Sequence, residues 1–147
     1  PAAQTGLISA DASSQKVPKM TIEFFAESNV RTRTLPRSAA TKVGGFVFVS
    51  GQVGRDEEGN VVAGGTGAQA RQTLRNVAHA LALAGCTLED VVKTTVWLDD
   101  ASDFDEFNRA YTEFFPGNKP ARSTLQAKNM AGTKVEIEAI AYKHEAD

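Results

Sequence analysis

The stretch GFVFVSGQVG, residues 45–54, is a dense run of β-branched and aromatic residues between glycines. In an extended chain, Phe46 and Phe48 would project from one side and Val47 and Val49 from the other. Because both alternating sets are apolar, the pattern predicts a strand that is buried on both of its faces. The sheet that contains this strand must therefore be covered on both sides.

The segment RDEEGNVV, residues 55–62, follows that strand directly. Gly59 and Asn60 are typical turn residues, and the β-branched ending predicts a hairpin with a second strand. The three adjacent acidic residues lack the ligand spacing of a calcium loop. We interpret them as solvated turn residues and expect no metal site.

Two helices are predicted by apolar residues at helical spacing. The first begins at TGAQ, residues 66–69, where Thr66 and Gln69 have the pattern of a capping box, and it extends to about Ala84. The second covers roughly residues 103–115 and ends before a Pro-Gly pair. Its apolar stripe consists of Phe104, Phe107, Tyr111 and Phe114.

Three further strands are predicted at DVVKTTVWL (90–98), NKPARSTLQ (118–126) and KVEIEAIAYK (134–143). In the first of these, one face is expected to consist of Val92, Thr94, Val96 and Leu98. The order of elements predicts an α+β domain with one sheet of about six strands and two helices packed on one face. The other face would be a large apolar patch, so we expect other copies of the chain to bury it.

Composition limits the possible functions. The 147 residues suffice for one domain, which we place at residues 20–147, and we interpret residues 1–19 as an arm, leader or tag remnant. The net charge of −2 and the lack of a basic cluster do not favour nucleic acid as a partner, and no apolar run is long enough for a membrane span. A single cysteine, Cys86, can form neither an internal disulfide nor a thiolate zinc site, which favours a reducing, cytoplasmic location.

Charged residues occupy unusual positions in the last two predicted strands. Arg122 is a permanent cation where the strand at 118–126 enters the core, unless it is simply solvated at a strand end. Glu136 shares a strand face with Glu138 and Ile140. The alternative interpretation is a solvent-exposed sheet surface, but this face is rather apolar for that. Partial desolvation would raise the pKa of Glu136 and suit it to proton transfer. We expect Arg122 and Glu136 to face one pocket.

Six blocks of the sequence, taken together and in order, resemble the RidA family, the YjgF-type reactive-intermediate deaminases. These blocks are FVFVSGQ (46–52), QARQTLRNV (69–77), DVVKTTVWLDDASDF (90–104), FNRAYTEFF (107–115), PARS (120–123) and EIEAIA (136–141). The resemblance runs from about Val30 to Tyr142. It implies a chorismate-mutase-like fold with a mixed sheet, and homotrimers with a central barrel and clefts between subunits.

The resemblance also implies an activity and the residues that carry it. The activity is hydrolysis of enamines and imines, such as 2-aminoacrylate, to keto acids and ammonia, with no metal and no cofactor. By resemblance, Arg122 would bind the substrate carboxylate, for which its planar fork is suited. Glu136 would act on the attacking water, and Asn108, Ser50 and Gly51 would line the cleft.

Two positions depart from the family pattern and are expected to line the same pocket. PRSAA at residues 36–40 replaces PYSQA, so that Arg37 stands where a tyrosine is usual, and Thr124 stands where the cysteine of ARSC is usual. A second arginine would read a second carboxylate, which favours a specialised catabolic deaminase similar to 2-aminomuconate deaminase. Alternatively, Arg37 is a loop arginine that points to solvent.

Other classes of function remain to be weighed against the metal-independent deaminase. A trimer that binds small carboxylic acids without chemistry is one alternative, because both substitutions fall in the pocket. A ribonuclease is disfavoured by the acidic balance and by the lack of a basic, aromatic-lined groove. A zinc deaminase is excluded, because one cysteine and no His-x-Glu motif cannot supply its ligands.

Overall fold

The computed structural model describes residues 19–144, so that nearly all of the expected arm at residues 1–19 lies outside the described residues. The described chain contains six strands and two α-helices, which confirms the α+β prediction. In chain order these are β1 (Ile22–Phe25), β2 (Ala40–Val43), β3 (Phe46–Val53), α1 (Gly65–Leu83), β4 (Val91–Leu98), α2 (Phe104–Phe114), β5 (Ala121–Gln126) and β6 (Val135–Tyr142). Short 3₁₀ turns precede β4 at Leu88–Asp90 and α2 at Ala101–Asp103.

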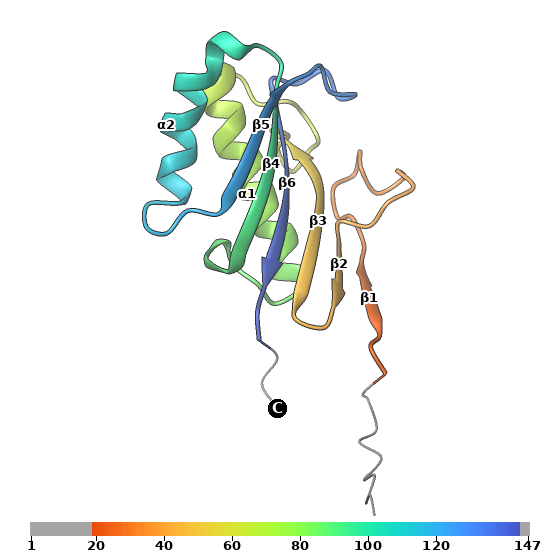
Figure 1. The fold of residues 1–147 in the computed structure, drawn as a ribbon. Coiled ribbons are helices and arrows are strands. Elements are labelled where there is room, and N and C mark those ends of the chain that lie inside the picture. Colours follow the sequence, from red (N-terminus) through yellow and green to blue (C-terminus); the bar gives the residue numbers. More distant parts are fainter. Residues whose placement is uncertain (1–18, 145–147) are drawn as a thin grey trace, which may run out of the picture.

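The strands form one mixed sheet in the order β1-β2-β3-β6-β4-β5. All neighbouring strands are antiparallel except β4 and β5, which are parallel. Both helices lie on the same side of this sheet, with α1 behind its centre and α2 towards the β5 edge (Figure 1). The predicted arrangement of two helices on one face is therefore confirmed. It leaves β5 as an edge strand, next to α2.

The core lies between the helices and the sheet face they cover. Val47 and Val49 of β3 point into it, as do Val96 of β4 and Ile137 of β6, and all four are buried. Leu74 of α1 is fully buried on the opposite side of this layer. The apolar residues of alternate strand positions thus meet the apolar stripe of the helix, as the two periods predict.

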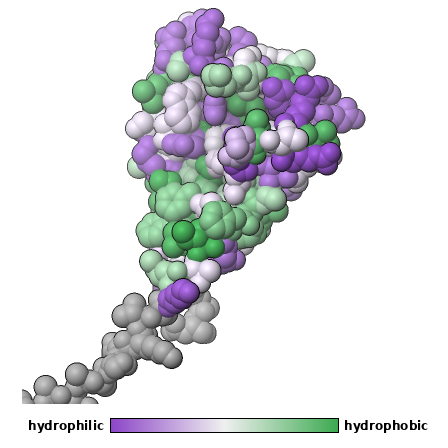
Figure 2. All heavy atoms as spheres, turned by 90° about the vertical axis from the view of Figure 1, so that its right-hand side faces the viewer, coloured by the Kyte–Doolittle hydropathy of each residue, from purple (hydrophilic) through white to green (hydrophobic). Residues whose placement is uncertain are grey.

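The opposite face of the sheet, which we call the open face, is uncovered in the single chain. Phe46 and Phe48 of β3 remain 46% and 42% exposed, and their rings lie together with that of Tyr142. Figure 2, which looks onto the β1 edge, shows hydrophobic residues gathered over the lower half of the molecule. Exposed Ile22 and Phe24 of β1 belong to this edge. One chain therefore buries only one of the two apolar faces expected for β3.

The capping box predicted at the start of α1 is wrong. The helix begins after Gly64, which has a left-handed backbone, and no side chain caps it. Thr66 instead donates to Asp103 Oδ2 at 2.6 Å, and Gln69 accepts a backbone N–H from the residue before β6. A carboxylate from α2, Glu106, accepts the N–H of Gly67 at 2.8 Å. Tertiary contacts therefore replace the local cap, because α2 brings acidic side chains to this helix end.

Two strand predictions are also corrected. Residues 55–62 form a turn that is closed by one isolated bridge, between Arg55 and Val61, so the predicted second strand does not form. In β4, Val92 was expected to share a face with Thr94. A register shift against β6 between Val91 and Lys93 exchanges the faces from which the first residues of β4 project. Val91 is therefore buried and Val92 is 46% exposed.

Candidate active site

An irregularity in β3 shapes the first part of the site. At Ser50 and Gly51, two residues of β3 lie opposite the single residue Glu138 of β6. Ser50 Oγ donates to the carbonyl oxygen of Ser38 at 2.7 Å, which ties the bulge to the preceding loop. A Cβ at Gly51 would overlap the carboxylate of Glu136. The bulge and its glycine therefore make room for this carboxylate, a common use of bulges next to functional sites.

Glu136 projects from β6 onto the open face and is half-buried. Burial raises the pKa of Glu136 above its ordinary value; nearby Arg37 acts in the opposite direction, and Glu138 adds to the rise. The expected partial desolvation is therefore present. A carboxyl group with a raised pKa both takes and returns a proton more readily near neutral pH.

Arg37 lies beside this carboxylate but is committed to another partner. Its Nη1 donates to the carbonyl oxygen of Gly51 at 2.8 Å, and its Nη2 lies 2.8 Å from Glu27 Oε1. The Glu27 side chain is only 7% exposed, and its other oxygen accepts a hydrogen bond from Thr32 at 3.0 Å. The alternative in which Arg37 points to solvent is wrong. Its charge is balanced by a buried acid that the sequence analysis did not identify.

A pocket of about 570 Å³ opens between the loop before β2 and the strands β3 and β6. Glu136 and Gly51 form part of its wall, and three arginines line it, namely Arg31, Arg37 and Arg55. Their clustering in the pocket was not predicted. The sequence signal for Arg31 and Arg37 was the run RTRTLPR, residues 31–37, whose third arginine, Arg33, lies outside the pocket wall. No comparable signal marked Arg55, which follows β3.

Arg122 lies on the other side of the sheet, under α2. Its guanidinium carbon is 4.8 Å from the ring centroid of Tyr111 and 5.7 and 5.6 Å from those of Phe104 and Phe107. Within residues 19–144, Arg122 has no ion pair with a carboxylate. Aromatic faces attract a cation without neutralising it. Arg122 is therefore held in place with its hydrogen-bond donors available for an acid.

Two more of the predicted site residues lie on the same side as Arg122. Thr124 follows it on the same face of β5 and is half-buried, and with Phe104 it lines a shallow pocket of about 260 Å³. Asn108 belongs to α2, next to Phe107, and is also half-buried. These residues form a group at the β5 edge that is separate from the group around Glu136.

Within one chain, Arg122 and Glu136 do not face the same pocket. Strand β4 lies between their strands and pairs with both. Arg122 pairs with buried Thr94, on the helix side, whereas Glu136 pairs with Trp97, three positions further along β4. Residues three apart in a strand project from opposite faces. The two halves of the site therefore belong to opposite faces of the sheet.

Comparison with known proteins identifies the family. The model of the family described as Endoribonuclease L-PSP matches residues 31–143, and the chain belongs to this family, the YjgF/RidA family. A human 2-iminobutanoate/2-iminopropanoate deaminase is 42% identical over 108 residues, which cover 72% of this chain and 79% of that protein. A RutC family protein of Pyrococcus abyssi is 43% identical over 110 residues, covering 74% of this chain and 87% of that protein.

Solved structures agree on the fold. The crystal structure of the E. coli YjgF gene product is 35% identical, with a TM-score of 0.77 over 83% of this chain and 99% of that one. The structure of E. coli TdcF with bound serine is 34% identical, with a TM-score of 0.70 over 74% of this chain and 88% of that one. The chorismate-mutase-like fold expected from the resemblance is confirmed.

Two further properties bear on function. Across residues 19–144, no three or more histidine, cysteine, aspartate or glutamate side chains are grouped as a metal ion would require. None of the helices in this described part is both long and apolar enough to cross a membrane.

Proposed function

We propose that the protein hydrolyses carboxylate-bearing imines and enamines to keto acids and ammonia. The observation that carries this proposal is a half-buried carboxyl group with a raised pKa, Glu136, in a protein whose second site group, Arg122, is a cation with no acidic partner in the described chain. The name of the human relative, a 2-iminobutanoate/2-iminopropanoate deaminase, supports the same reaction.

The proposed site is completed between copies of the chain. Because Arg122 and Glu136 project from opposite faces of one sheet, a pocket that contains both needs Arg122 from one copy and Glu136 from another. The apolar open face with Phe46 and Phe48, and exposed Leu125 on the edge strand β5, supply surfaces for such contacts. We propose a closed homotrimer with three equivalent clefts, as the family resemblance implies. A heterologous contact repeated with a rotation that closes gives such a ring.

In the proposed mechanism, Arg122 binds the substrate carboxylate through two parallel hydrogen bonds and fixes the imine carbon near Glu136. Glu136 removes a proton from a water molecule as the water oxygen bonds to the imine carbon, and the imine nitrogen takes up a proton from solvent, which gives the neutral carbinolamine. The carbinolamine then receives a proton on its nitrogen from Glu136. The C–N bond breaks as ammonia leaves, and Glu136 takes the hydroxyl proton as the C=O bond forms. Glu136 then releases this proton to solvent, so that imine and water give keto acid and ammonia.

A second candidate is a binding module that uses the same cleft without chemistry. It is favoured by one observation: Arg37, which stands where the family has a pocket tyrosine, is taken up by its ion pair with Glu27. The structure of E. coli TdcF with bound serine is an example of a similar protein holding a small carboxylate-bearing molecule. In this candidate, keto acids bind but imines are not consumed faster than in water.

Ammonia release separates the candidates. Imines are generated freshly from amino acids by an added amino acid oxidase, and loss of the imine is followed with and without the protein. The deaminase proposal expects acceleration that Glu136→Gln abolishes, while binding of the product keto acid persists. Binding without acceleration by the unmodified chain would establish the binding module instead. Intact RNA after incubation with the same preparation is expected as well, in agreement with the net charge of −2.

A further inference from the structure

Two of the three arginines in the 570 Å³ pocket have no acidic partner in the described part of the chain. Arg37 is paired with Glu27, but neither Arg31 nor Arg55 takes part in an ion pair within residues 19–144. Arg55 is half-buried and Arg31 is exposed. The pocket thus contains one balanced and two unbalanced guanidinium groups.

The two unbalanced groups converge on one residue. Arg55 Nη1 donates to the carbonyl oxygen of Gly59 at 2.9 Å, and a Cβ at Gly59 would lie 2.6 to 3.0 Å from the Cγ, Cδ and Nε atoms of Arg31. Arg55 Nη2 makes a second, longer bond of 3.5 Å to the carbonyl oxygen of Ala131. These carbonyl contacts orient Arg55 but supply no negative charge. Two neighbouring cations without a counter-charge repel one another and favour an anion between them.

The size of the pocket agrees with a ligand larger than a three-carbon imino acid. Its volume of about 570 Å³ lies within the range of roughly 300–1,000 Å³ that is usual for drug-sized ligands. Its wall also includes apolar side chains, Leu35 and Val53 among them, and Val53 is the strand partner of Glu136. A carbon chain that lies along these residues would extend from Glu136 to Arg31 and Arg55.

We infer that Arg31 and Arg55 form a second anion subsite, which selects substrates with a second, distal carboxylate. Resting on the proposed function, this names the substrate class as imines of 2-amino dicarboxylic acids. The first carboxylate is bound by Arg122 of a neighbouring copy, and the imine carbon lies at Glu136. The distal carboxylate lies between Arg31 and Arg55. Arg37 positions the wall through Glu27 and Gly51 and does not read the second carboxylate.

The test is the equilibrium binding of non-reacting keto acids to the full chain, measured by isothermal titration calorimetry. The probes are 2-oxoglutarate, which has a distal carboxylate, and 2-oxobutanoate, which has none. Arg31→Ala is expected to weaken binding of 2-oxoglutarate at least 10-fold and to change that of 2-oxobutanoate less than 2-fold. Arg33→Ala, an exposed arginine of the same loop outside the pocket wall, is the matched control and should change neither.

Arg55→Gln should have the same selective effect, but Arg31→Ala carries the test because Arg31 is exposed and its loss does not endanger folding. Equal weakening of both acids by Arg31→Ala, no weakening of either, or no preference of the unmodified chain for 2-oxoglutarate overturns the inference. The measurement needs no turnover. The unmodified chain could fail to release ammonia while Arg31→Ala selectively weakens the binding of 2-oxoglutarate. That result would refute the deaminase proposal and still support the anion subsite.

Discussion

Arg122 and Glu136 project from opposite faces of the same sheet, although only strand β4 separates the strands that carry them. Arg122 rests against the aromatic rings of α2, and Glu136 lies in the pocket beside the bulge of β3. A substrate that touches both must therefore be held by two copies of the chain. The proposed activity therefore requires an assembly of at least two copies of the chain.

Mixing two inactive variants should restore activity. Arg122→Ala and Glu136→Gln are each expected to be inactive, yet a mixed assembly contains clefts that take Arg122 from one variant and Glu136 from the other. Random mixing in a closed ring leaves about a quarter of the clefts intact. The measurement is ammonia release after the two variants are unfolded and refolded together. Mixed assemblies that form, as shown by a mass tag on one variant, but remain inactive would show that one chain supplies both groups.

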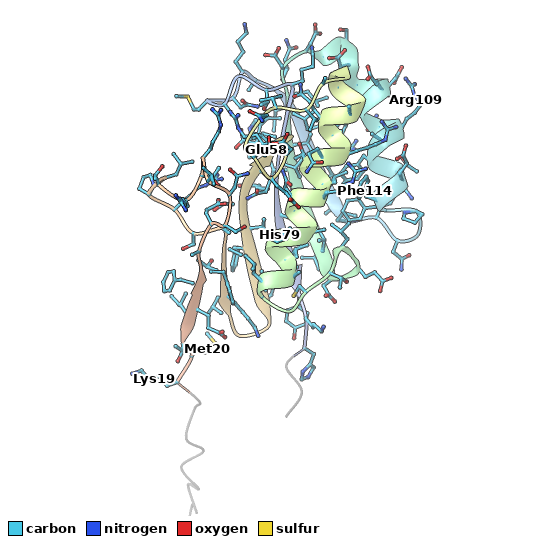
Figure 3. All side chains as sticks on the ribbon, turned by 180° about the vertical axis from the view of Figure 1, so that it is seen from behind. Lys19, Met20, Glu58, His79, Arg109 and Phe114 are labelled. Carbon is cyan, nitrogen blue, oxygen red and sulfur yellow. The ribbon has the colours of Figure 1, made fainter. Side chains whose placement is uncertain are left out.

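Removal of Arg122 should reduce kcat/KM by at least about 100-fold, or about 2.7 kcal/mol at roughly 1.36 kcal/mol per decade. Arg122→Lys is expected to recover only part of the loss, because an ammonium group cannot make two parallel bonds to a carboxylate. Arg109→Ala removes a cation that projects away from the sheet on the same helix as the aromatic rings (Figure 3), and it should retain the activity. Steady-state kinetics on the three variants provides the comparison. Wild-type kcat/KM in Arg122→Ala would remove this residue from the site.

Glu136→Gln should abolish turnover, and the pH dependence should identify the reason. A base acts when deprotonated, so activity in the unmodified protein should rise with pH through the pKa of Glu136, which burial raises. Glu138→Gln removes a charge that contributes to this rise, so the acidic limb of its pH profile should move to lower pH while activity is retained. The pH profile of kcat/KM for the two proteins checks this. An unchanged acidic limb in Glu138→Gln would assign it to another group.

The raised pKa of Glu136 should also make the contribution of this residue to stability less favourable at neutral pH than at acidic pH. Because the folded chain holds the proton of Glu136 more tightly than the unfolded chain, stability falls as pH rises from the unfolded pKa to the folded one. Glu136→Gln should therefore raise the Tm at pH 7 and have a much smaller effect near about pH 4, where the carboxyl is largely protonated in both states. Thermal unfolding at the two pH values checks the prediction. A lower Tm at pH 7 would mean that the ionised carboxylate stabilises the fold.

Periodicity was sufficient to predict both helices and the strands β3, β4, β5 and β6, but it predicted neither the short strands β1 and β2 nor the order of the strands in the sheet. The apolar run around Val47 located β3 but not which of its two apolar faces points into the core of one chain, whereas the alternation around Val96 located β4 and most of its core-facing residues, because a strand that buries one face must repeat every second residue. The position of β4 between β5 and β6 follows from long-range packing, and no local pattern encodes it. The pairing of Arg37 with Glu27 was missed for a similar reason. Both residues lie outside helices and strands, where no regular spacing indicates which side chains meet.

The ion pair of Arg37 with Glu27 should stabilise the loop that forms the wall of the pocket. Arg37→Met would leave Glu27 buried without its counter-charge, and the expected loss is about 2 kcal/mol, less than for a fully buried pair because the Arg37 side chain is 29% exposed. The double variant Glu27→Gln/Arg37→Met should lose less than the sum of the single losses. Chemical denaturation of the four proteins measures this coupling. Additive losses would show that the two residues act independently.

Gly51→Ala should test whether the position of the Glu136 carboxylate matters for catalysis, because the variant keeps this residue but displaces its carboxylate. The added Cβ would occupy the space of Glu136 Oε1, so the carboxylate must turn away or the bulge must open. Because Arg122, Arg31 and Arg55 have no recorded contact with Gly51, we expect kcat to fall at least about 10-fold with little change in the binding of keto acids, as for loss of a group that acts mainly in the transition state. Gly117→Ala, at a glycine with open space around it, is the control and should retain full activity. Equal loss of keto acid binding and of kcat in Gly51→Ala would instead indicate that the bulge supports the substrate itself, and that the close approach of Gly51 to Glu136 has no separate role in the chemistry.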